Sequence, residues 1–161
     1  MERRAARAII DADAVVANWR LFQRMSGGAA CAAVIKADCY GLVAATIAPA
    51  LARVGARSFF TAALGEALEA HKALGEGVRI FVLNGADREN ASAFPPTLIP
   101  VLNSLKQIAA WNGRGPAALH IDTGMNRLGL PLEDVAAAAR ALPAPALVLS
   151  HLACAPDKSH E

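Results

Sequence analysis

Short apolar runs recur along the chain and alternate with longer segments in which apolar residues follow helical spacing. The runs predict strands at residues 31–35, 58–62, 79–83, 98–102, 119–122 and 146–149. The intervening segments predict helices that begin near residues 11, 41, 65, 87, 103 and 131. Strands that alternate with helices are typical of a parallel sheet with right-handed crossovers. Both a doubly wound sheet and a barrel are compatible with this pattern.

Particular residues mark the ends of the predicted helices. Asp11 or Asp13 can cap the first helix, and Asn103 can cap a later one, because short polar side chains accept hydrogen bonds from free backbone N–H groups. Pro49 is expected to kink the alanine-rich helix that contains it. A short polar helix is expected over residues 87–94.

Lys36 is the first charged residue after the run at residues 31–35, and Tyr40 and Gly41 follow it closely. The run is small and aliphatic, which suits a strand that is buried on both faces. The strand would therefore place one amine at the mouth of a core, where a partly desolvated lysine can form a Schiff base with an aldehyde. Most lysines at strand ends simply meet water, so this pattern alone does not identify a site.

Two later strands also end in ionisable groups. Residues 119–130 read Leu-His-Ile-Asp-Thr-Gly-Met-Asn-Arg-Leu-Gly-Leu, and residues 147–155 read Leu-Val-Leu-Ser-His-Leu-Ala-Cys-Ala. They contribute Arg127 and His151. Because the carboxyl ends of parallel strands meet on one face of the fold, we expect the amine, the guanidinium and the imidazole around one site. This combination indicates pyridoxal phosphate chemistry.

With these segments in view, almost the whole chain resembles the N-terminal barrel domain of the alanine racemase family. Residues 33–41, 122–129 and 150–153 correspond to three of its signatures, in the family's order and spacing. The resemblance implies an α/β fold, a TIM-type (β/α)8 barrel of the alanine racemase type. A complete barrel of this kind needs about 250 residues. Residues 1–161 are therefore expected to form a partial pyridoxal-phosphate-binding barrel with about six of eight strands, without the rest of the barrel or the C-terminal β domain.

The resemblance also implies a role for each residue that matches a family motif. Lys36 corresponds to the lysine that holds pyridoxal 5'-phosphate and serves as one of two catalytic bases. Tyr40 corresponds to the tyrosine that hydrogen-bonds the cofactor phosphate. Arg127 corresponds to the arginine beside the cofactor's phenolic oxygen and the substrate carboxylate, and His151 to a histidine near the pyridine ring. The implied reaction is the interconversion of L-alanine and D-alanine, which supplies D-alanine for peptidoglycan, in a homodimer.

Some positions depart from the family's pattern. His120 stands where many members have a carbamylated lysine, whose negative charge partners the arginine, and a histidine cannot reproduce it. Asn126 replaces a common glycine, which is tolerable because Asn adopts left-handed conformations more easily than most residues. Val43 replaces another glycine, and its β-branched side chain could alter the approach to the phosphate. Asp122 is expected to support Arg127 through local bonds from its side chain to the backbone.

Composition and charge narrow the classes of function. Hydrophobic residues make up 55% of the 161 positions, which is enough for a sizeable core, and the formal net charge of +2 is too small to indicate nucleic acid as a partner. The charged start of the chain is neither a signal peptide nor a membrane span. The three cysteines have no metal-ligand spacing and suggest free thiols in a cytoplasmic protein. No pattern in the sequence supports a metal site.

The family's second base is a tyrosine that the partner subunit supplies from a C-terminal domain, whereas Tyr40 is the only tyrosine here. The chain alone is therefore expected to be inactive as a racemase. Three alternatives stay open: a racemase of another amino acid such as serine or lysine, a non-catalytic pyridoxal-phosphate-binding barrel protein, and a remnant that binds no ligand.

Overall fold

A computed structural model describes residues 8–154, and a parallel sheet of six strands forms their centre. The strands are β1 (Ala33–Val34), β2 (Ser58–Thr61), β3 (Arg79–Val82), β4 (Leu98–Leu102), β5 (Ala118–His120) and β6 (Leu147–Leu149). They lie side by side in the order β1-β2-β3-β4-β5-β6, and every neighbouring pair is parallel. A doubly wound sheet would reverse its strand order at one point. The uninterrupted order is that of a partial barrel.

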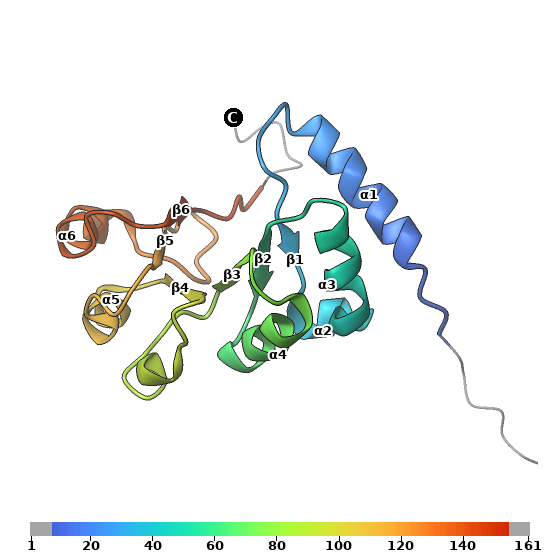
Figure 1. Ribbon diagram of the computed structural model, residues 1–161. Coiled ribbons are helices and arrows are strands. Elements are labelled where there is room, and N and C mark those ends of the chain that lie inside the picture. Colours follow the sequence, from blue (N-terminus) through green and yellow to red (C-terminus); the bar gives the residue numbers. More distant parts are fainter. Residues whose placement is uncertain (1–7, 155–161) are drawn as a thin grey trace, which may run out of the picture.

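One helix precedes the first strand, and the others lie in the connections between successive strands, along the outer side of the curved sheet (Figure 1). They are α1 (Ala12–Met25), α2 (Lys36–Tyr40), α3 (Ala44–Arg53), α4 (Leu64–Leu74), α5 (Leu105–Trp111) and α6 (Val135–Ala141), with short 3-10 turns η1 (Ala91–Ala93) and η2 (Leu132–Asp134). None of the helices within residues 8–154 is both long and apolar enough to cross a membrane.

Alternation along the strands separates two apolar layers. Phe59 and Ile80 point outward and pack in one core with residues of α1, α3 and α4. The residues next to them, Phe60 and Phe81, point inward and stack with their ring centroids 4.8 Å apart. Helices can therefore cover only the outer layer, while the inner layer forms the floor of the open barrel.

The same alternation brings one residue from the carboxyl end of each strand onto the inner face. Each of these residues lies two positions after an inward-facing residue of the same strand, so it continues the inner row. They are Lys36, Ala62, Leu83, Asn103, His120 and His151. Six segments that are far apart in the sequence thus contribute to a single edge of the sheet. The site described below lies at this edge.

The structure confirms the strand positions and several helix ends. Asp11 caps α1, because its Oδ1 accepts a hydrogen bond from the Ala14 N–H at 3.0 Å. Gly75 follows the last residue of α4, as predicted. Pro49 lies inside α3, which continues to Arg53.

Three expectations were wrong. The first strand is not buried on both faces, since β1 lies at the edge of the sheet and Val34 is 44% exposed. Ser104 rather than Asn103 caps α5, because the Ser104 hydroxyl accepts the Gln107 N–H at 3.2 Å. The helix expected over residues 87–94 is only the short turn η1, followed by two prolines that cannot donate backbone hydrogen bonds.

Candidate functional site

A cavity of about 570 Å³ opens where the strands end. All four residues that the sequence indicated line it: Lys36, Tyr40, Arg127 and His151. The apolar part of its wall consists of Val34, Phe60, Ala62, Leu83, Leu128 and Leu149. No carboxylate among the described residues lines the cavity, although two cations do. An anionic ligand with an apolar body suits such a wall.

The backbone that follows Lys36 forms a left-handed turn. Ala37, Asp38, Cys39 and Tyr40 have φ angles of 51°, 51°, 56° and 55°. Each such residue is unfavourable for an L-amino acid, and strained backbone of this kind clusters at functional sites. The turn brings the side chains of Lys36 and Tyr40 to the same cavity, with Lys36 Nζ 5.9 Å from the centre of the Tyr40 ring.

Cys39, in the same turn, faces the core instead of the cavity. Its side chain is buried, and its backbone N–H donates to Ile35 O at 2.9 Å. Burial is the main cause that raises the pKa of the Cys39 thiol, and the Asp38 carboxylate adds to it. The thiol therefore stays protonated and unreactive at neutral pH, which agrees with its predicted role as a small apolar residue.

The loop that carries Arg127 leaves β5 and returns beside it. The Leu130 N–H donates to His120 O at 2.7 Å, and the Asp122 N–H donates to Leu130 O at 2.9 Å. Gly129 has a φ of 115° and lies against the Asp122 backbone, where a Cβ would come within 2.7 Å of Asp122 N. The loop closes tightly only because this position lacks a side chain.

Asp122 organises the interior of this loop, as predicted. Its Oδ1 accepts hydrogen bonds from the Gly124 N–H at 2.9 Å and from the Asn126 N–H at 3.1 Å. These backbone bonds lower the pKa of the Asp122 carboxyl, so it stays ionised. Asn126 adopts the expected left-handed conformation, with a φ of 54°. Arg127 follows it, exposed at the rim of the cavity.

The loop after β6 is joined to the Arg127 loop by a pair of hydroxyls. Thr123 Oγ1 and Ser150 Oγ lie 2.7 Å apart, and His151 follows Ser150 directly. This contact joins the two loops that carry Arg127 and His151, which both line the cavity.

His120 and Asn103 form a buried pair that the sequence did not reveal. They are 5% and 8% exposed, and His120 Nδ1 lies 3.0 Å from Asn103 Oδ1. Asn103 Nδ2 donates to Leu83 O at 2.9 Å and to Val101 O at 2.8 Å. Because the amide protons are occupied, Asn103 Oδ1 is an acceptor and His120 Nδ1 must carry a proton. In neutral His120 the lone pair then lies on Nε2, and the ring lines the cavity.

Burial is the main cause that lowers the pKa of His120 below its ordinary value of 6.5; Asp122 opposes this shift, and His151 and Arg127 add to it. His120 is therefore protonated at a higher pH in the unfolded chain than in the folded chain. We expect the free energy of unfolding to fall as the pH drops from 6.5 to the lowered pKa of folded His120. Above pH 6.5, where His120 is neutral in both states, this loss of stability should be absent.

Urea unfolding between about pH 7 and about pH 5 checks this expectation. His120→Asn should lose part of the slope of stability against pH, because the variant has no imidazole to protonate at this buried position. Equal slopes in the native chain and the His120 variant would contradict the assignment.

Residues 8–154 hold no group of three or more His, Cys, Asp or Glu side chains that could bind a metal ion. The cysteines Cys31, Cys39 and Cys154 are free thiols, as the sequence suggested.

Comparison with known proteins agrees with this arrangement. Residues 10–161 match the family described as alanine racemase, N-terminal domain. The chain belongs to the alanine racemase family. It is 48% identical over 158 residues to an alanine racemase from Cereibacter sphaeroides and 43% identical over 168 residues to one from Rhizobium meliloti. These matches cover 94% and 97% of the chain but only 45% and 44% of the relatives.

Solved structures of alanine racemases share the fold. The protein from Bartonella henselae, described with covalently bound pyridoxal phosphate, superposes with a TM-score of 0.86 at 36% identity and covers 94% of this chain and 48% of its own. A histidine racemase from Leuconostoc mesenteroides superposes with a TM-score of 0.79 at 26% identity and covers 92% of this chain and 44% of its own. The fold is therefore an incomplete TIM-type barrel of the alanine racemase type, and the chain spans about half the length of its relatives.

Proposed function

We propose that the chain forms the pyridoxal-phosphate-binding part of an alanine racemase. The observation that carries this proposal is the single cavity that combines an amine, a phenol, a guanidinium and an imidazole with apolar walls and no carboxylate among the described residues. This set suits pyridoxal phosphate, which has an aldehyde, an anionic phosphate and a flat ring. Membership of the family and the covalently bound pyridoxal phosphate of the Bartonella henselae protein support the same choice.

Bound pyridoxal phosphate supplies a conjugated ring that stabilises the negative charge left when the α-proton of an amino acid is removed. Lys36 would hold the cofactor through its amine, and it can hold a proton on its own side of the cavity. Tyr40 can donate a hydrogen bond from its hydroxyl to the phosphate. Arg127 offers a planar, permanently charged fork to the phenolic oxygen or to the substrate carboxylate. His151 can pack beside the ring.

Inversion of configuration requires a second base on the opposite side of the substrate. Tyr40 is the only tyrosine of the chain, and we assign it to the phosphate, so the second base comes from elsewhere in the full assembly. We infer a homodimer in which the partner supplies that tyrosine, a cytoplasmic location, and a role in providing D-alanine for peptidoglycan. The 161-residue chain alone should not racemise alanine at the rate of an intact racemase, and a chiral amino-acid assay checks this.

A racemase of a different amino acid is the second candidate. The histidine racemase from Leuconostoc mesenteroides has the same fold, so this half of the barrel is compatible with more than one substrate. Turnover of serine, lysine or histidine in preference to alanine by the full assembly would favour this candidate.

Borohydride trapping tests the proposed cofactor. The chain is incubated with pyridoxal phosphate, reduced, digested and analysed by mass spectrometry. We expect the added mass on the peptide that contains Lys36, because this lysine is half-buried beside other groups that can hold the phosphate. A label distributed equally over Lys72 and Lys106, both exposed, would mean that the chain binds no pyridoxal phosphate at a defined site.

A further inference from the structure

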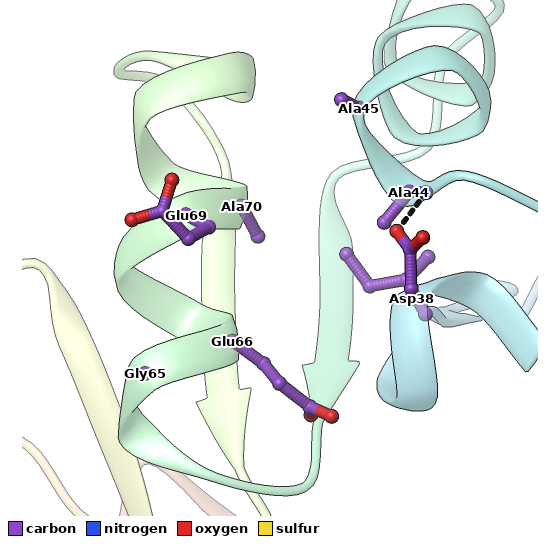
Figure 2. Close-up of a pocket in the computed structure, with 8 residues that line it drawn as sticks. Asp38, Ala44, Ala45, Gly65, Glu66, Glu69 and Ala70 are labelled. Carbon is purple, nitrogen blue, oxygen red and sulfur yellow. Dashed lines mark hydrogen bonds between the residues drawn. The ribbon is translucent and has the colours of Figure 1, made fainter. Parts of the chain in front are cut away.

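Glu66, in the first turn of α4, joins two loops that are distant in the sequence. Its Oε2 accepts hydrogen bonds from the Ala62 N–H at 2.7 Å and the Ala63 N–H at 3.4 Å, at the start of its own helix. Its Oε1 accepts the N–H of Ala37 at 2.9 Å, and Ala37 follows Lys36 directly. Figure 2 shows the Glu66 carboxylate extending from α4 toward the segment that carries Asp38.

The first loop is an ordinary helix start, but the second is the left-handed turn. A carboxylate that only capped α4 would accept N–H groups from the start of that helix. Glu66 also accepts the Ala37 N–H, which lies 29 positions earlier in the chain. Residues in left-handed conformation persist only where surrounding contacts hold them, because the conformation itself is unfavourable. The Ala37 N–H is the first donor of this turn, and Glu66 is its acceptor.

A second carboxylate holds the far side of the turn. Asp38 Oδ1 accepts the Ala44 N–H at 2.7 Å, at the start of α3, as the dashed line in Figure 2 shows. The turn is thus tied to α3 through Asp38 and to α4 through Glu66. Both carboxylates lie in a cavity of about 340 Å³ outside the strand ends, together with Glu69. Because Asp38 Oδ1 and both Glu66 oxygens already accept backbone N–H groups, this cavity is better explained as support for the turn than as a cation site.

We propose that Glu66 is a positioning residue that holds residues 37–40 in the left-handed turn and thereby directs Lys36 and Tyr40 into the site cavity. The consequence for cofactor binding rests on the proposed function, whereas the hold on the turn does not. Glu66 lines the outer cavity and does not line the site cavity, so it acts only through the backbone of the turn.

Hydrogen exchange of Glu66→Gln, followed by mass spectrometry, tests the hold on the turn without any ligand. Glutamine has the same shape, but its NH2 group cannot accept a hydrogen bond, so either the turn or the helix start loses an acceptor. Glu66→Asp keeps the charge at the start of α4 but is too short to reach Ala37. Glu69→Gln, one turn along on an exposed part of α4, is the matched control.

We expect the amides of residues 37–41 to exchange about tenfold faster in Glu66→Asp than in Glu69→Gln, which corresponds to the loss of one charge-assisted hydrogen bond. The half-saturating concentration of pyridoxal phosphate for trapping at Lys36 should rise in parallel. Faster exchange confined to residues 62–63 would show that Glu66 is only a helix cap and would overturn the proposal. Unchanged exchange at residues 37–41 in both Glu66 variants would overturn it as well.

The two measurements, hydrogen exchange and trapping at Lys36, distinguish a failure of this proposal from a failure of the proposed function. If the native chain shows no trapping at Lys36, the cofactor assignment fails, and the exchange arm still decides whether Glu66 holds the turn. If trapping occurs and the turn loosens in the variants while the half-saturating concentration stays unchanged, Glu66 does not position Lys36, and the proposal is wrong.

Discussion

Replacement of Lys36 by alanine is expected to reduce trapping of pyridoxal phosphate to the background of the exposed lysines. Among the described residues that line the site cavity, Lys36 alone carries a primary amine that can bond the aldehyde. Lys36→Ala removes this amine without disturbing the core, since the side chain is only half-buried. The measurement is the absorbance of the bound cofactor, followed by borohydride reduction and peptide mapping.

Two matched variants make the result specific. Lys36→Arg keeps the positive charge and cannot form the bond, so it should retain weak reversible binding and lose trapping. Lys106→Ala, on the exposed side of α5, should behave as the native chain. Equal trapping in all of these proteins would show that the fold does not present Lys36 to the cofactor, and the proposed function would lose its main support.

Replacement of Gly129 by alanine is expected to cost more stability than any other single methyl group added to the Arg127 loop. The new Cβ would meet Asp122 N at 2.7 Å and Ile121 C at 3.0 Å, and both are backbone atoms that cannot turn aside. Overpacking of this kind costs about 1–3 kcal/mol. The strained φ of 115° adds a further cost. Because the same loop carries Arg127, binding of pyridoxal phosphate should weaken as well.

Gly124 offers the matched control for this prediction. It lies in the same loop with a φ of 124°, but no atom lies within 4 Å of an added Cβ. Gly124→Ala therefore measures the conformational cost alone. In urea unfolding, the free energy of unfolding of Gly129→Ala should be lower than that of Gly124→Ala by about 1–3 kcal/mol, which is the cost of the overlap. Equal losses of stability in the two variants would show that the loop relaxes away from Asp122.

The strands and most helices could be predicted because their signals are local. Each of the six runs predicted as strands became a strand, although the run at residues 31–35 kept only two residues in the ladder. The runs that stayed long, such as Leu98–Leu102, are buried along their whole length and have neighbours on both sides. The edge position of β1 depends on how the sheet is assembled, which no single segment encodes.

The candidate site was predicted only in part. Lys36 stands out as a charge at the end of an apolar run, and Arg127 as a cation in the polar turn that follows another. Asn103 resembled a helix cap, and its contacts with His120, Leu83 and Val101 appear only when three strands lie side by side.

The left-handed turn has no sequence signal at all. Residues 37–40 contain no glycine, the residue that adopts this conformation most readily. The turn depends on the acceptor that Glu66 supplies from another βα unit. Propensity is a property of neighbours in sequence, and it therefore could not predict a conformation that a distant carboxylate stabilises.

The sequential strand order has a consequence for synthesis on the ribosome. Each new strand adds to the growing edge next to its predecessor, so β1 to β4 can pair before β5 has emerged. Lys36 leaves the ribosome first and His151 more than a hundred residues later, which corresponds to a delay on the order of ten seconds at ~5–20 residues per second. During that delay the Lys36 amine belongs to a nascent chain in which the site cavity is incomplete. Other aldehydes in the cell can then react with this amine before the residues that complete the cavity have been synthesised.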